Sequence, residues 1–127
     1  MRKLFISCPM KNRSEENIRM TFDRLHKIAE AVYGESLEVI PTYIEDNPPK
    51  CRTEGLWYLG KSIELLSQAD YFIGICGDNA FQYNGCTVES DAAKLYGVPV
   101  YLVPTVFSAP DVAKAELVYN GTGELIN

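Results

Sequence analysis

Residues 71–76, Y-F-I-G-I-C, form a nearly continuous apolar run in the middle of the chain. Such a run is typical of a strand that is buried on both faces of a parallel sheet. Further apolar segments at residues 3–8, 37–44 and 98–103 predict three more strands around it. A sheet that is buried on both faces requires helices on each side, which the segments between the strands have to supply.

Those intervening segments have the spacing of amphipathic helices. Ser14 is placed to cap the first helix, and Gly34 is placed to end it. Residues 57–67 and 87–96 predict two further helices. Strands that alternate with helices imply right-handed crossovers and a parallel sheet.

We therefore predict an α/β fold, a three-layer sandwich with a mainly parallel sheet of four to five strands that is Rossmann-like or flavodoxin-like. The length of 127 residues fits a single domain over residues 1–127. The pattern after Pro104 is less regular, with a short helix expected at residues 109–114 and a short last strand at 117–119.

Composition excludes several classes of function. The chain is 46% hydrophobic and 23% charged, which is typical of a globular protein and not of a disordered one. The net charge of -5 disfavours a nucleic-acid groove, and no apolar run reaches the roughly 18 residues of a membrane span. Residues 1–10 are interpreted as a first strand and not as a signal peptide. The four cysteines lack the close pairs of a zinc site and indicate a reducing cytoplasm.

In folds of this type, ligands bind beyond the carboxyl ends of the strands. This rule selects the loops at residues 8–13, 45–55 and 77–85, which contain neither a dinucleotide-binding G-x-G-x-x-G motif nor a P-loop. The candidate substrate-binding residues in and beside these loops are Ser7, Pro9, Met10, Asn12, Trp57, Gly77, Asp78, Tyr83, Asn84 and Gly85.

Glu89 is the candidate catalytic residue, because it lies one turn into the helix that follows the third loop. The helix dipole there favours the ionised carboxylate, which a nucleophile requires, although an ordinary charge near a helix start has the same pattern. Trp57 is either a core residue or a lid over a flat ligand, and Asp70 is interpreted as a cap or turn residue. These residues alone are compatible with binding of a base or nucleotide without establishing catalysis.

Three stretches carry a family resemblance: K-L-F-I-S-C-P-M at residues 3–10, A-D-Y-F-I-G-I-C at 69–76 and N-G-C-T-V-E-S-D-A-A-K-L-Y-G-V-P-V at 84–100. Over residues 3–104 the chain resembles the nucleoside 2-deoxyribosyltransferase-like superfamily, especially its short bacterial and phage branch. The resemblance implies that Glu89 attacks the anomeric carbon of a nucleoside and holds the sugar covalently. Another base, or water in related hydrolases, then takes the sugar. It further implies a homodimer or higher homo-oligomer and no metal or organic cofactor.

The chain departs from the family pattern at the polar partners of the glutamate. Phe5 stands where the transferases have an orienting tyrosine, and Ser62 stands where they have an aspartate. Tyr83 or Asn84 lies near the position of a second aspartate. Two main hypotheses therefore remain: an enzyme of N-glycosidic bonds, either a deoxyribosyltransferase or an N-hydrolase, and a non-catalytic module that binds or senses a nucleotide. A third interpretation is an oligomerisation or interaction domain, which would show an exposed apolar patch without a pocket.

Overall fold

The computed structural model describes residues 1–8, 14–42, 46–75, 84–103, 118–119 and 125–126. Its centre is a parallel sheet with the strand order β2-β1-β3-β4. The strands are β1 (Arg2–Ser7), β2 (Leu37–Val39), β3 (Tyr71–Ile75) and β4 (Val100–Val103). This order is that of flavodoxin-like sheets, in which the ligand site lies at the carboxyl ends of β1 and β3, where the strand order reverses. The predicted fold class is confirmed.

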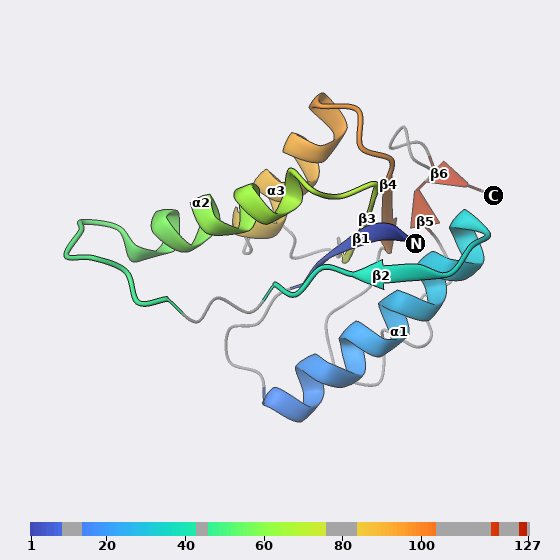
Figure 1. The fold of residues 1–127 in the computed structure, drawn as a ribbon, viewed down its shortest axis with the longest axis horizontal. Helices are drawn as coiled ribbons and strands as arrows, with labels where there is room; N and C mark the ends of the chain where they lie inside the picture. Colours follow the sequence, from blue (N-terminus) through green and yellow to red (C-terminus); the bar gives the residue numbers. More distant parts are fainter. Residues whose placement is uncertain (9–13, 43–45, 76–83, 104–117, 120–124, 127) are drawn as a thin grey trace.

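Three helices cover the sheet (Figure 1). α1 (Glu15–Tyr33) lies on one face, and α2 (Glu54–Leu66) and α3 (Asn84–Leu95) lie on the other. Ser14 caps α1 as predicted, since its hydroxyl accepts a hydrogen bond from the backbone N–H of Asn17 at 3.1 Å. Gly34 ends the same helix in the left-handed conformation, with φ of 73°, which glycine adopts without a steric cost.

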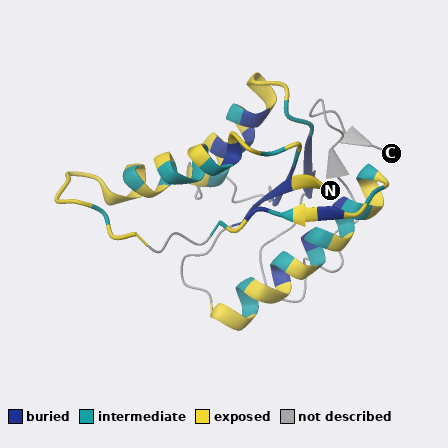
Figure 2. Cartoon of the chain, viewed as in Figure 1, coloured by how far each residue is buried: buried dark blue, intermediate teal, exposed yellow. Residues whose placement is uncertain are grey.

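The core consists of two hydrophobic clusters, one on each face of the sheet. In β1, Leu4 and Ile6 pack in the cluster beneath α1, whereas Phe5 packs in the cluster beneath α2 and α3. Phe5 stacks on Phe72 of β3 with ring centroids 5.6 Å apart. Figure 2 shows the central strands as buried and the outward helix surfaces as exposed. Because side chains alternate along a strand, Ser7 lies on the same face as Phe5.

Several element boundaries differ from the prediction. β2 ends at Val39 instead of residue 44, although the Ile40 N–H still donates to the Leu4 carbonyl at 2.9 Å. β4 starts at Val100 instead of residue 98, since Pro99 contributes only a carbonyl, which accepts from Phe72 N–H at 2.9 Å. The strands predicted at residues 3–8 and 71–76 occupy Arg2–Ser7 and Tyr71–Ile75.

α2 and α3 each begin three residues earlier than expected, at Glu54 and Asn84. The first turns of both helices contain a glycine, Gly55 and Gly85, which the sequence pattern had assigned to loops. A glycine weakens a helix by only about 1 kcal/mol, so it does not prevent the helix from starting there.

The last strand was predicted only in part. β5 (Val118–Tyr119) pairs in antiparallel fashion with β6 (Leu125–Ile126), a strand too short for its pattern to be detected. The short helix expected at residues 109–114 lies outside the described residues. None of the described helices is long and apolar enough to cross a membrane.

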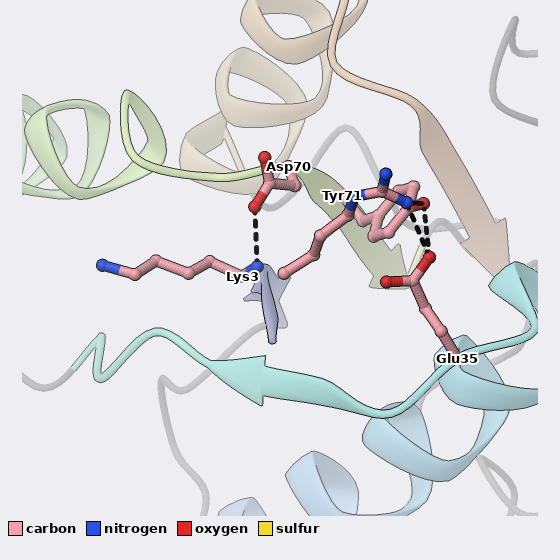
Figure 3. A network of polar contacts seen from close by, with 5 residues as sticks. Lys3, Glu35, Asp70 and Tyr71 are labelled. Carbon is pink, nitrogen blue, oxygen red and sulfur yellow. Dashed lines mark hydrogen bonds and ion pairs between the residues drawn. The ribbon is translucent and has the colours of Figure 1, made fainter.

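The amino edge of the sheet, where the parallel strands begin, carries a polar network (Figure 3). The Asp70 carboxylate accepts a hydrogen bond from the Lys3 N–H at 2.8 Å, and Asp70 N–H donates to the Lys3 carbonyl at 2.9 Å. Glu35 accepts hydrogen bonds from Arg2 at 2.8 Å and from the Tyr71 hydroxyl at 2.9 Å. Asp70 therefore ties β3 to β1, in agreement with the structural role predicted for it.

Candidate functional site

A buried hydrogen bond joins Ser7 and Glu89 at the carboxyl edge of the sheet, where the parallel strands end. The Ser7 hydroxyl donates to Glu89 Oε1 at 2.7 Å. Glu89 is only 9% exposed and Ser7 only 3%. The two residues are 82 positions apart in the sequence, and the chain order β1, β3, α3 brings them together at the point where the strand order reverses.

The site is the polar continuation of the hydrophobic cluster beneath α2 and α3. That cluster contains Phe5 of β1, Leu66 of α2 and Ala93 of α3. Both helices run antiparallel to the strands, because each starts from the carboxyl end of one strand and returns to the amino end of the next. Ser7 follows Phe5 by two residues on the same face of β1. Ser62 and Glu89 precede Leu66 and Ala93 by one helical turn, on the same faces of α2 and α3. At this end of the hydrophobic cluster, three polar side chains therefore take the place of apolar ones. We call Ser7, Ser62 and Glu89 the serine–glutamate site.

The environment of Glu89 determines its protonation. Burial raises the pKa of the Glu89 carboxyl above its usual value of 4.5, and hydrogen bonds from Ser7 and Ser62 partly oppose that rise. This corrects the expectation that the helix dipole would favour the ionised form. Glu89 lies beyond the first turn of α3, where the dipole effect has faded, and burial has the larger influence.

Gly74 provides the space on which this arrangement depends. It pairs with Ser7 in the register of β1 and β3. A Cβ atom at Gly74 would approach Cε1 of Phe72 to 3.0 Å and the Ser7 carbonyl oxygen to 3.2 Å. Any larger residue at this position would push against the strand segment that holds the Ser7 hydroxyl.

Of the other predicted residues, the structure describes three. Trp57 is half-buried in α2, and its ring contacts are with Tyr58 and Lys61 of the same helix; none of its described contacts joins it to Glu89. Gly85 is exposed in the first turn of α3, and Asn84 begins that helix, although its side chain is not described. The residues that lie outside the described part of the chain are Pro9, Met10, Asn12, Gly77, Asp78 and Tyr83.

Ser62 is the residue that sequence reasoning missed. It was interpreted only as the loss of a family aspartate, whereas its hydroxyl helps to lower the pKa of Glu89. The signal was present in the sequence, because Ser62 precedes the core residue Leu66 by one helical turn and therefore shares its face. Among the described residues, no group of three or more His, Cys, Asp or Glu side chains is arranged to hold a metal ion.

Comparisons with known proteins support the fold. No family model and no curated protein matches the sequence. Among solved structures, the chain is similar to a 2-deoxyribosyltransferase from Bacillus psychrosaccharolyticus, with a TM-score of 0.53 and 18% identity over 91% of this chain and 82% of that one. It is also similar to a conserved protein from Enterococcus faecalis V583, with a TM-score of 0.51 and 16% identity over 79% of this chain and 61% of that one. At these identities the similarity establishes the α/β fold alone.

Proposed function

We propose that this chain is an enzyme of N-glycosidic bonds that acts on nucleosides or nucleotides, with Glu89 as the nucleophile. The observation that carries the proposal is the buried hydrogen bond of 2.7 Å between Ser7 and Glu89, at the edge of the sheet where this fold binds ligands. The structural similarity to a 2-deoxyribosyltransferase supports the same class of substrate.

In the proposed reaction, a carboxylate oxygen of Glu89 attacks the anomeric carbon of the sugar. The bond from that carbon to the base breaks, and the base leaves with the electron pair and takes up a proton. The sugar is then bound to Glu89 as an ester, which a second base or water resolves, restoring the carboxylate. A covalent intermediate of this kind replaces one difficult step by two easier ones.

Phe5 has no hydroxyl that could orient Glu89, and Ser7 supplies one in its place. Phe5 is fully used in the core, where it stacks on Phe72. Ser7, two residues further along β1, supplies a hydroxyl to Glu89 from the same face of the sheet. Its hydrogen bond fixes one carboxylate oxygen and favours the ionised form that attack requires.

The burial of Glu89 also favours a second candidate function. Because burial raises the pKa of Glu89, a larger share of this carboxyl is neutral at a given pH than in an ordinary glutamate. A neutral carboxyl donates a hydrogen bond but does not act as a nucleophile. The alternative is therefore a non-catalytic module that binds or senses a nucleotide and leaves it intact.

The proposal is tested by incubating the protein with ribonucleosides, deoxyribonucleosides and their monophosphates, with and without a second base. We expect chromatography to detect free base or exchanged nucleoside, and a Glu89→Ala variant to produce neither. Dependence on the added base would separate transfer from hydrolysis. If no substrate in the panel reacts but calorimetry detects binding of an intact nucleotide, the binding module replaces the enzyme as the function.

A further inference from the structure

The side chain of Thr42 contains a buried polar atom that the fold does not use. Its hydroxyl oxygen has no hydrogen-bond partner in the described part of the chain. A buried hydroxyl that loses its contact with water and gains no protein partner is unfavourable, and native structures contain few of them. A group of this kind therefore requires an explanation, and its position in the fold suggests one.

Thr42 lies just beyond the carboxyl end of β2, beside β1. The register of the two strands pairs Leu4 with Val39, and the Ile40 N–H continues the ladder by donating to the Leu4 carbonyl at 2.9 Å. Extending this register by three residues beyond Val39, the last paired residue of β2, would bring Thr42 level with Ser7. Neighbouring strands lie about 4.8 Å apart, so this extension would place Thr42 about one strand spacing from the serine that holds Glu89.

We also expect Thr42 to lie on the same side of the sheet as Ser7. Ile40 packs in the hydrophobic cluster beneath α2 and α3, together with Phe5. Side chains of an extended chain alternate, so the position two residues after Ile40 returns to that side, as Ser7 does two residues after Phe5. Thr42 is therefore expected beside the serine–glutamate site, on the chain segment that follows the neighbouring strand β2.

We propose that Thr42 is a substrate-contact residue whose hydroxyl bonds a hydroxyl of the substrate's sugar ring. This rests on the proposed function, because attack by Glu89 on the anomeric carbon requires the sugar ring to lie over Ser7 and its neighbours. A threonine hydroxyl and a sugar hydroxyl each donate and accept, so they can pair in either direction. Thr42 is half-buried, and rotation about χ1 exchanges its hydroxyl and methyl groups, which turns the hydroxyl towards a ligand.

The first test measures whether the hydroxyl is unpaired without a ligand. Thr42→Val keeps the shape of the side chain and removes only the hydroxyl. We expect the melting temperature of the unliganded protein to stay unchanged or to rise by about 2–5 °C. The matched control is Thr21→Val, because the buried Thr21 hydroxyl donates to the Asn17 carbonyl at 3.0 Å and its removal should lower the melting temperature. A similar decrease in Thr42→Val would overturn the proposal.

The second test measures ligand binding by calorimetry, in a Glu89→Gln background that prevents turnover. The probes are adenosine, 2′-deoxyadenosine and 2′,3′-dideoxyadenosine. We expect Thr42→Val to weaken the probes that carry the contacted ring hydroxyl by about five- to tenfold, equivalent to about 1–1.4 kcal/mol. The affinity for the analogue that lacks this hydroxyl should change less than twofold, since that analogue cannot form the hydrogen bond with Thr42 in either protein.

The possible failures of the binding test are distinguishable. An equal loss for all three probes would assign Thr42 to the base or to the 5′ end and overturn the proposal. Unchanged binding of every probe would exclude a contact at Thr42 while leaving the proposed function intact. If the parent protein binds none of these probes and releases base from no nucleotide, the proposed function and this inference both fail.

Discussion

The two edges of the sheet treat polar groups in opposite ways. At the amino edge, polar groups pair with one another through hydrogen bonds and an ion pair, mostly in contact with water. The residues of this cluster are Arg2, Lys3, Glu35, Asp70 and Tyr71. At the carboxyl edge, the buried Glu89 has only serine hydroxyls as described side-chain partners. The buried hydroxyl of Thr42 there has no partner among the described residues.

We propose that this difference separates a structural polar cluster from a functional one. Hydrogen bonds within the amino-edge cluster hold β1, β3 and the end of α1 together, and that contribution accounts for all of its residues. A buried carboxylate without a cation partner works against folding, because burial penalises the charged form. Such a group is retained where it has another use, which is why we assign chemistry to the carboxyl edge.

The largest expected effect is that of Glu89→Gln. It removes the proposed nucleophile, so base release should fall by at least about 10³-fold. The free energy of unfolding at pH 7 should rise, by about 1 kcal/mol, because the variant no longer buries a charge. Since the folded state raises the pKa of Glu89 above 4.5, the wild type loses stability as the pH rises through and above that value. Denaturant unfolding at pH 4 and pH 7 measures this, and the difference between variant and wild type should be larger at pH 7.

The matched control at the other edge is Glu35→Gln. Glu35 forms an ion pair with Arg2 at 2.8 Å, so removing its charge should leave base release unchanged and slightly lower stability. If Glu89→Gln lowers stability at pH 7 as Glu35→Gln does, the carboxyl edge contains an ordinary structural carboxylate and the contrast disappears.

Gly74→Ala should have the next largest effect. The new Cβ would lie 3.0 Å from the Phe72 ring and 3.2 Å from the Ser7 carbonyl, so these neighbours must move by a few tenths of an ångström. We expect a loss of about 1–3 kcal/mol in the free energy of unfolding. Base release should fall as well, since the same shift moves the Ser7 hydroxyl away from Glu89.

Gly60→Ala in α2 is the control for this substitution. A Cβ at Gly60 would meet nothing within 4 Å, and alanine favours a helix by about 1 kcal/mol over glycine. The same chemical change should therefore stabilise the protein at Gly60 and destabilise it at Gly74. Denaturant unfolding of the two variants would contradict the argument if the signs were equal.

The sequence predicted the fold because each level of pattern pointed to the same architecture. The run at residues 71–76, the cap at Ser14 and the glycine at Gly34 are local signals, and local signals fix element types. Boundaries failed where a single residue decided them. Pro99 delayed the start of β4 because it lacks an N–H, and Gly85 did not delay the start of α3.

The site was predicted less completely, because its properties depend on packing between distant segments. Ser7 was named from its position at the end of the first strand and Glu89 from its position one turn into the helix after the third loop, and they do meet. The effect of the surroundings on Glu89 was predicted in the wrong direction, since its position in the helix suggests a lowered pKa while burial raises the pKa. Ser62 and Thr42 become recognisable only when their level in the sheet and helices is known.

Removing the serine hydroxyls should change the pH dependence of the reaction. The hydrogen bonds from Ser7 and Ser62 lower the pKa of Glu89, so Ser7→Ala and Ser62→Ala should each raise it further. Because only the ionised carboxylate attacks, the acid limb of kcat/KM should move to higher pH in both variants. At pH values below that limb, we expect about a tenfold loss of kcat/KM.

Conservative replacements provide the control for the serine variants. Ser7→Thr and Ser62→Thr keep a hydroxyl and should retain an acid limb near that of the wild type. Another serine, the buried Ser90, donates to the Thr87 carbonyl at 3.1 Å, and Ser90→Ala should leave the pH profile unchanged. A loss of activity without any shift of the limb would assign Ser7 and Ser62 to the support of the fold instead of to Glu89.

The smallest effect is expected at the amino edge, where Asp70→Ala removes the acceptor for the Lys3 N–H. The exposed N–H can bond water instead, so the loss should be about 0.5–1.5 kcal/mol. Asp70→Asn keeps an acceptor oxygen and should cost less. Base release per folded molecule should be the same in both variants as in the wild type, since Asp70 lies at the opposite edge from Glu89. A change in kcat for either variant would show that the two edges are coupled through β1 and β3, and the amino-edge cluster could then no longer be treated as structural alone.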